Sequence, residues 1–189
     1  MKKVFLLFIS FSILVSCSDD TQETLIDVAA SEIIGEWELI EFTSEGISKT
    51  TTLGQTVDTE YSVYGKDFDF DVVFTDNPKN VTGTGSYNSV ATYTILGETT
   101  TEVIPTNTAN GLEDGTWSVN GGILKITPSI QTSLNVASDA KIIEFDGDTM
   151  RLKLNINQSA KGEEQGIAFE ISSIGTAYIG LKRKQSNTL

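Results

Sequence analysis

The chain has 189 residues with 26 acidic and 13 basic side chains, one cysteine and no histidine. A net charge of −13 argues against nucleic acid and anionic lipid surfaces as partners, because both are themselves negatively charged. The absence of histidine and the single cysteine remove the commonest general bases, nucleophiles and soft-metal ligands. We therefore expect a protein that is not an enzyme and that uses neither a cofactor nor a metal.

Residues 1–16 predict an export signal. Lys2 and Lys3 precede an apolar run over residues 4–15, which is too short to span a bilayer comfortably. The run leads into the sequence LVSC, ending at Cys17, which resembles the lipobox of bacterial lipoproteins. The resemblance implies cleavage before Cys17 and attachment of diacylglycerol to its sulfur, so that acyl chains such as palmitate anchor the protein. An ordinary secretory signal or an uncleaved anchor helix is the alternative.

Cleavage before Cys17 would leave a mature chain with no cysteine available for a disulfide. Because residues 1–16 hold two lysines and no acidic residue, the mature chain has 11 basic and 26 acidic residues, a net charge of −15. Asp19 and Asp20 resemble signals that send lipoproteins to the outer membrane, where the domain would face the periplasm or the cell exterior. We expect residues 17–31 to be the lipidated cysteine and a flexible tether, roughly 20 Å long as a coil.

The first strand is predicted over residues 33–42. Trp37 and Leu39 alternate with two glutamates, which is the period-2 pattern of a strand with one buried face. Gly35, two residues before Trp37, allows a tight backbone entry and is expected to leave room for the indole. This strand begins the part of the sequence that is able to fold.

The following residues predict more strands separated by turns, and helical periodicity is almost absent. A turn is expected at residues 44–46, and an irregular strand with a loop over residues 49–64. The strand predicted over residues 66–74 is the most regular, with phenylalanines on one face and aspartates on the other. Gly83 and Gly85 indicate a bend in the next strand. The pattern favours an all-β domain.

Beyond residue 95 we expect an edge strand, two hairpins and a closing pair of strands. The segment 98–104 is predicted to form a sheet edge or a long hairpin arm, and it ends at Pro105, which has no backbone N–H to donate. Turn sequences at residues 120–122 and 146–147 each join two short strands. Residues 158–166 are expected to form a polar loop before the last two strands.

Eight to ten antiparallel strands suffice to close an up-and-down β-barrel, which leaves no open edge. The barrel is expected over residues 32–185, with a tail at 186–189. The Gly-x-Trp sequence at Gly35 and Trp37 resembles the signature of lipocalins, in particular the lipocalin-like domains of bacterial lipoproteins. In that family the tryptophan plugs one end of the barrel, and a basic residue of the last strand packs across it. Arg183 shares the parity of the inward residues of the final strand, so the resemblance places it over Trp37.

The resemblance covers about residues 33–184 and is loose over 47–110. Trp117, in a second Gly-x-Trp sequence, and Leu152 and Leu154 match the hairpins of the family. The inward apolar side chains are the candidate ligand-lining residues, because the interior of a small barrel is either filled or holds one small ligand. These candidates are Phe68, Phe70, Phe74, Tyr87, Tyr93, Trp117, Met150, Leu152 and Leu154.

The first functional hypothesis is therefore an outer-membrane-anchored, lipocalin-like lipoprotein that binds a small apolar or amphipathic ligand. A second hypothesis is an interaction module that contacts a protein or glycan through long, Thr-rich loops at residues 44–66 and 96–115. A third is a hydrolase that uses strand carboxylates such as Asp69 and Asp71, although their spacing is more typical of a solvent-facing strand. The sequence indicates no particular oligomeric state.

Overall fold

The computed structural model describes residues 24–107, 114–129, 138–164 and 166–185. In this part of the chain there is one short helix and nine strands, all paired antiparallel. The elements are α1 (Ala30–Ile33), β1 (Gly35–Thr52), β2 (Gln55–Phe74), β3 (Asn80–Ile95), β4 (Glu98–Thr106), β5 (Gly115–Asn120), β6 (Ile123–Pro128), β7 (Ser138–Phe145), β8 (Thr149–Glu164) and β9 (Ile167–Arg183).

The strands pair in the order β2-β1-β9-β8-β7-β6-β5-β3-β4, and β2 also pairs with β3. The second pairing closes eight of the strands into a ring of hydrogen bonds, with β4 attached outside the ring to β3. The contact between β3 and β5 is short, since only Asn80 and Val81 pair with β5. The predicted all-β class is confirmed.

The long strands extend past the short ones and divide the molecule into two regions. Strands β5, β6 and β7 are six to eight residues long, whereas β1, β2, β3, β8 and β9 have 16 to 20. The pairing of β7 with β8 ends at Leu154. Beyond that level six strands continue as an open curved sheet in the order β8-β9-β1-β2-β3-β4. We call this open part, formed by residues 43–64, 88–106, 154–164 and 166–177, the trough.

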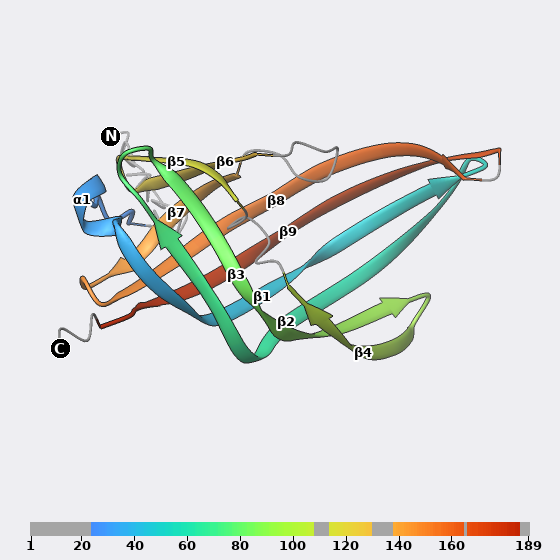
Figure 1. Cartoon of the computed structure of the whole chain (residues 1–189). Helices are drawn as coiled ribbons and strands as arrows, with labels where there is room; N and C mark the ends of the chain where they lie inside the picture. Colours follow the sequence, from blue (N-terminus) through green and yellow to red (C-terminus); the bar gives the residue numbers. More distant parts are fainter. Residues whose placement is uncertain (1–23, 108–113, 130–137, 165, 186–189) are drawn as a thin grey trace, which may run out of the picture.

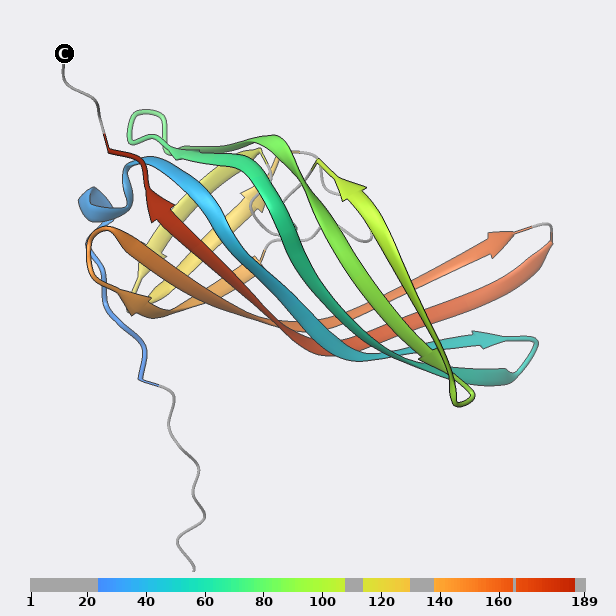
Figure 2. The ribbon, with the colours of Figure 1, turned by 90° about the horizontal axis from the view of Figure 1, so that it is seen from below.

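The other region, which carries α1 and β5–β7, is called the closed end. Figures 1 and 2 show the hairpins β1–β2, β3–β4 and β8–β9 running away from it in one general direction. Both ends of the described chain, at Thr24 and Gln185, lie at the closed end (Figure 2). The tips of these three hairpins are therefore at the opposite end of the molecule from the ends of the described chain.

Residues 44–66 form most of the β1–β2 hairpin, so the turn and loop predicted there are wrong. The chain reverses only at Leu53 and Gly54, where both residues have positive φ. The arms are joined by a ladder of main-chain pairs, by a hydrogen bond between the Thr51 and Thr56 hydroxyls, and by an ion pair between Lys49 and Asp58. The sequence here lacks a clean alternation because polar residues occupy both faces, and the long pairing partner is what makes it a strand.

The polar loop predicted at residues 158–166 is likewise mostly strand, because β8 pairs with β9 as far as Glu164. Other local predictions are confirmed. Residues 98–106 form the edge strand β4, which runs one residue past Pro105, where it was expected to end. A two-residue turn at Gly121-Gly122 and a three-residue turn at 146–148 join the predicted hairpins. Their glycines have positive φ, as tight hairpin turns require.

Gly85 also marks a bend, as expected. Its φ is +120°, and a Cβ there would lie 2.0 Å from the carbonyl oxygen of Asp69. In the facing strand β2, Asp67 and Phe68 together oppose the single residue Tyr87, which is a bulge. The bend and the bulge lie at the boundary between the closed end and the trough.

The end of the sheet nearest the termini is covered by the N-terminal segment. The backbone N–H of Ile26 donates to the carbonyl of Ile142 at 3.0 Å, Val28 is buried, and Ile33 of α1 is inaccessible to solvent. The segment assigned to the tether from the sequence therefore packs on the core from about Ile26 onward. A short apolar pattern around a four-residue helix has too little periodicity to be recognised in the sequence.

Candidate functional site

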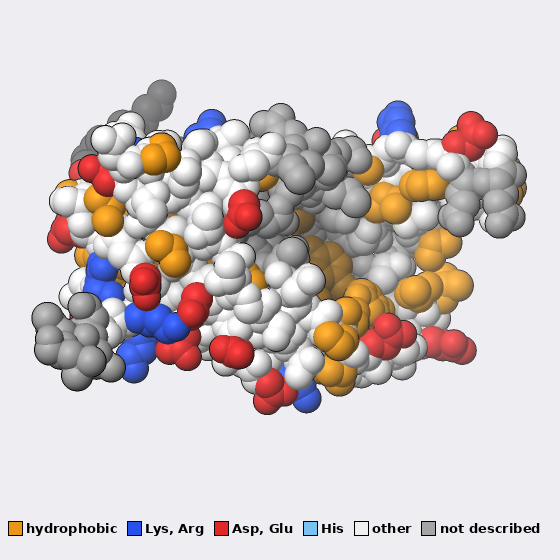
Figure 3. Space-filling view, viewed as in Figure 1, with side chains coloured by type: hydrophobic (Ala, Val, Ile, Leu, Met, Phe, Trp, Pro, Cys, Tyr) orange, Lys and Arg blue, Asp and Glu red, His pale blue; other side chains and the backbone are white. Residues whose placement is uncertain are grey.

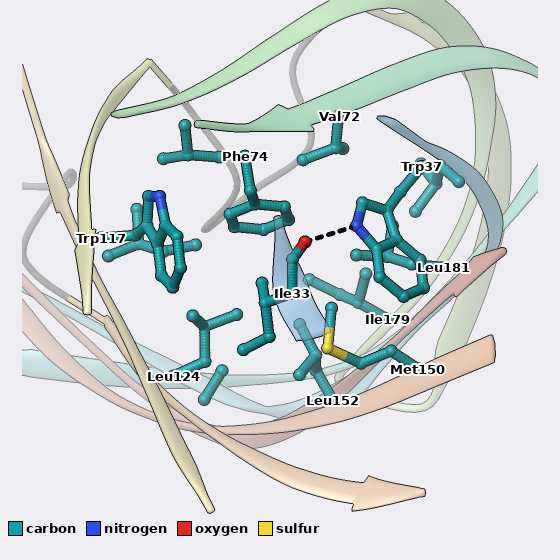
Figure 4. Close-up of a cluster of buried hydrophobic side chains, with 14 of the residues drawn as sticks. Ile33, Trp37, Val72, Phe74, Trp117, Leu124, Met150, Leu152, Ile179 and Leu181 are labelled. Carbon is teal, nitrogen blue, oxygen red and sulfur yellow. Dashed lines mark hydrogen bonds between the residues drawn. The ribbon is translucent and has the colours of Figure 1, made fainter. Parts of the chain in front are cut away.

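Six of the nine predicted ligand-lining residues lie in the hydrophobic core, most of them deep in the closed end. They have exposed fractions of 4% or less and pack against Ile33, Trp37 and Leu124. Figure 4 shows Trp37, Phe74 and Trp117 with these neighbours around α1. The six residues are Phe70, Phe74, Tyr87, Trp117, Met150 and Leu152.

Aromatic contacts fill the centre of this end. The rings of Phe74 and Trp117 meet edge to face with centroids 5.5 Å apart, and the rings of Trp37 and Phe145 lie 6.4 Å apart. Each indole N–H is also bonded, Trp37 to the carbonyl of Ile33 at 2.8 Å and Trp117 to that of Thr75 at 2.9 Å. Because buried indole N–H groups are satisfied and large side chains interdigitate, these residues form a packed core.

Arg183 lies over Trp37, as the parity of the final strand predicts. Its guanidinium carbon is 4.2 Å from the indole centroid, and the two residues are opposite each other in the β1–β9 ladder. The guanidinium also donates hydrogen bonds to the carbonyls of Gly147 at 2.8 Å and Ile34 at 3.0 Å, and to that of Glu32. Arg183 therefore ties the last strand, the β7–β8 turn and the helix segment together around one indole.

Gly35 has a different neighbour from the one expected. Its φ is +134°, and a Cβ at this position would lie 2.8 Å from Nη1 of Arg183. The residue thus makes room for the guanidinium of Arg183 and not for the indole of Trp37. The physical reason is that the cation lies on the exposed side of the ring, where the chain enters the first strand.

The other three predicted residues lie at the border of the core or beyond it. Phe68 and Leu154 are partly buried against the core, and Tyr93 lies farther along β3 in the trough. Tyr87 also lies at this border, with its ring 5.5 Å from that of Phe68. The Tyr87 hydroxyl is buried and makes no hydrogen bond with the described residues. Burial raises the pKa of this phenol, and the neighbouring Ser89 hydroxyl lowers it by less.

The register of the six strands of the trough shows which side chains share its inner face. Each row crosses the sheet from β8 to β4 and contains residues with the same parity as the buried core. The row nearest the core is mainly apolar, and the next two mix apolar, small and hydroxyl side chains. The rows are Leu154, Ala177, Ser44, Val63, Ala91 and Glu102; then Ile156, Gly175, Gly46, Tyr61, Tyr93 and Thr100; then Gln158, Ser173, Ser48, Thr59, Ile95 and Glu98.

Gly46 and Gly175 form a pair in the floor of the trough. A Cβ on either residue would lie within 2.7 Å of the Tyr61 hydroxyl oxygen and closer still to backbone atoms. The Tyr61 side chain therefore lies over this glycine pair and takes the space that larger side chains there would need. Gly46 is the sequence signal for this pair, but beside Ser44 and Glu45 its pattern is that of a turn.

A groove of about 610 Å³ lies on this inner face near the tip of the β3–β4 hairpin. Apolar groups form one wall and two carboxylates lie on β4. Figure 3 shows hydrophobic side chains in and beside a hollow on the half of the molecule that carries the hairpins. The groove is lined by Thr59, Tyr93, Ile95, Leu96, Glu98, Thr100 and Glu102.

A second groove, of about 410 Å³, lies mainly on the outer face of β8, β9, β1 and β2. Here Arg151 makes a two-pronged ion pair with Glu41, with both N–O distances 2.9 Å, and its guanidinium lies 4.8 Å from the ring of Tyr178. Glu41 raises the pKa of Arg151 by hydrogen bonding. The exposed ring of Tyr64 and several hydroxyl side chains complete the lining.

The strand carboxylates singled out as possible catalytic groups have structural partners or face solvent. Asp71 pairs with Lys184, and Asp67 accepts a hydrogen bond from the Asn88 amide at 3.0 Å. Among the residues that the structure describes, no group of three or more acidic, histidine or cysteine side chains is placed to hold a metal ion.

Comparison with known proteins gives no assignment. No protein-family model, no curated protein and no solved structure matches this chain. No helix in the described part of the chain is long and apolar enough to cross a membrane. Cys17, the export signal at 1–16 and the tail at 186–189 lie outside the described residues.

Proposed function

We propose that this chain is a lipocalin-like β-barrel lipoprotein that binds an amphipathic ligand along the inner face of the trough. The ring of strands and the Arg183 contact over Trp37 support the barrel, because both match what the Gly-x-Trp resemblance implies. The apolar inner face of the trough carries the proposal of a ligand. The inner face of the trough is the same face of the strands that carries the core, but beyond β5–β7 no described strand lies opposite to cover it.

The filled closed end supports a ligand position in the trough rather than at the centre of the ring. Leu152, Ile179 and Leu181 are inaccessible to solvent, so they offer no surface to a ligand there. In the groove, by contrast, Ile95 and Leu96 expose 43% and 88% of their surface. Covering such side chains with an alkyl chain is favourable by about 25 cal/mol per Å² of apolar surface removed from water.

The ends of the described chain support an orientation for this lipoprotein. An anchor on Cys17, seven residues before Thr24, would hold the closed end nearest the membrane, because Thr24 lies at that end. The trough would then face away from the outer membrane. Labelling of the expressed protein with radioactive palmitate tests the anchor, and Cys17→Ala should abolish the label.

Ligand binding is tested with the mature domain from residue 18, which lacks the lipidation site, and the neutral fluorescent probe N-phenyl-1-naphthylamine. We expect saturable enhancement of fluorescence that neutral detergents with an alkyl chain compete away. The double variant Tyr93→Ser, Ile95→Ser should reduce affinity at least fivefold.

The matched control is Ile47→Ser, Ile174→Ser, which removes an exposed apolar pair from the outer face of β1 and β9 in the same sheet. It should bind the probe as the wild type does. Absence of saturable uptake by the folded wild-type domain would refute the proposal, and so would equal losses in the two double variants.

A second candidate function is recognition of a glycan by the outer-face groove, a narrower form of the interaction module. Tyr64 offers an exposed ring on which sugars stack, and Arg151, Glu41 and neighbouring hydroxyls offer hydrogen-bond groups. Titration calorimetry with maltohexaose, cellohexaose and chitohexaose tests it, with Tyr64→Ala as the variant that should lose binding. No heat of binding with any of the three would count against it.

A further inference from the structure

The inner face of the trough carries charge of one sign only. In the three rows set out above, from Leu154 to Gln158 on β8 and across to β4, the charged side chains are Glu98 and Glu102. Lys49 on β1 and Lys161 on β8 have the parity of the outer face. They pair there with Asp58 and Glu170. In these rows the inner wall is therefore an uncharged surface of apolar, small and hydroxyl side chains with an acidic rim on one side.

Neither glutamate of the rim has a cationic partner among the described residues. They flank Thr100 on β4, so their Cα atoms are roughly 13 Å apart and each is about 7 Å from Thr100. Directly across the ladder lie Ala91, Tyr93 and Ile95. A head group placed at Thr100 would thus have a carboxylate on either side and an apolar surface next to it.

We propose that the trough selects amphiphiles with a positively charged head group, such as an alkylammonium. This inference rests on the proposed function and adds the chemical class of the ligand. The alkyl chain covers Tyr93, Ile95 and Leu96, while the cation lies against the β4 carboxylates. An anionic head group at the same place would meet two like charges without a compensating base, which disfavours fatty acids and alkyl sulfates.

The test is competition against N-phenyl-1-naphthylamine with three dodecyl amphiphiles, each below its critical micelle concentration. These are dodecyltrimethylammonium, dodecyl maltoside and dodecyl sulfate, which share the chain and differ in charge. We expect the cation to compete about tenfold better than the sulfate, with the maltoside between them, as partly screened charges at this range imply. The preference should shrink as salt is raised.

The decisive variant is Glu98→Gln, Glu102→Gln. In this variant the three amphiphiles should compete at similar concentrations, while uptake of the neutral probe stays unchanged. The matched control is Glu60→Gln, Glu163→Gln. Both residues are exposed on the outer face of the trough, on β2 and β8, and the change in net charge is equal. The control should keep the preference for the cation.

The outcomes separate the two proposals. Equal competition by cation and sulfate in the wild type would overturn the charge selectivity while uptake of the neutral probe still supported a ligand in the trough. Equal loss of selectivity in both double variants would also overturn it, because overall charge and not the rim would then be responsible. Failure of the neutral probe and all three amphiphiles to bind would refute the ligand site itself.

Discussion

The closed end and the trough are built from the same strands, yet one is filled and the other is open. At the closed end the inner residues at one level of β8, β9 and β1 are Met150, Leu181 and Leu39, all inaccessible or nearly so. Farther along the same three strands the corresponding residues are Ile156, Gly175 and Gly46. The size of the inward side chains, together with the end of β5–β7, decides where the core stops.

The comparison separates stability from binding. Large side chains that interdigitate supply the free energy of folding at one end, and small ones keep a surface available at the other. If this division is correct, substitutions at the closed end should unfold the protein, and those in the trough should change binding with little loss of stability. Four measurements can break or sharpen it, and they are given in order of expected effect.

The largest effect is expected from Trp37→Ala. It removes a fully buried indole, its hydrogen bond to Ile33 and the ring under Arg183, so the free energy of unfolding should fall by about 3–5 kcal/mol. The trough counterpart is Tyr93→Ala, which should cost less than about 1 kcal/mol. Urea unfolding followed by circular dichroism measures both, and similar losses would contradict the division.

The next effect is expected from Arg183→Met, which keeps much of the side-chain volume but removes the charge. The carbonyls of Gly147 and Ile34 lose a donor, and the indole loses its cation, so we expect a loss of about 2–3 kcal/mol. Arg183→Lys should recover part of this loss. An ammonium replaces the charge, but it cannot reach all three carbonyl acceptors of the planar guanidinium. A loss below about 0.5 kcal/mol in urea unfolding would show that the contacts of Arg183 contribute little to the stability of the closed end.

A smaller, pH-dependent effect is expected at Asp146 in the β7–β8 turn. The backbone N–H groups of Thr149 and Asp148 donate to its carboxylate, which holds its pKa below the ordinary value of 3.8. Because the folded-state pKa is lowered, the ionised carboxylate stabilises the fold above about pH 4, and that contribution is lost as the pH falls further.

The variant Asp146→Asn keeps an acceptor but cannot titrate. It should be less stable than the wild type at pH 7, and the gap should narrow as the pH falls below about 4. Urea unfolding between pH 7 and pH 3 tests this, and an NMR titration midpoint for Asp146 at or above 3.8 would contradict it.

The smallest effect is expected from Tyr87→Phe at the border of the two regions. The change removes a buried hydroxyl that has no hydrogen-bond partner among the described residues, so stability at pH 7 should stay within about 1 kcal/mol of the wild type. Because burial raises the pKa of this phenol, the wild type should lose stability above about pH 10, where the unfolded chain ionises first.

Unfolding of Tyr87→Phe and of the exposed control Tyr64→Phe between pH 7 and pH 11 tests this prediction. The first variant should lack part of the alkaline loss and the second should retain it. A large loss of stability at pH 7 in Tyr87→Phe would mean that the hydroxyl is bonded, for instance by water in the trough.

Part of the architecture could be predicted from local patterns. The alternation around Trp37 and Leu39, the Gly121-Gly122 turn and the parity of Arg183 each depend on a few adjacent residues, because a strand has period 2 and tight turns need special backbone angles. They were enough for the all-β class and for the contact of Arg183 with Trp37. The segments at 44–66 and 158–166 were missed because polar residues lie on both faces of their strands.

The tertiary structure alone decided what the inner residues do. Phe70 and Trp117 have the same inward parity as Tyr93, and nothing in the sequence separates core from groove. The difference arises because β5–β7 are short and leave the far parts of the five long strands without partners across the ring. The sequence by itself determined the two faces of each strand, a local property, whereas the register and relative lengths of distant strands determined which part of the inner face is filled and which stays open.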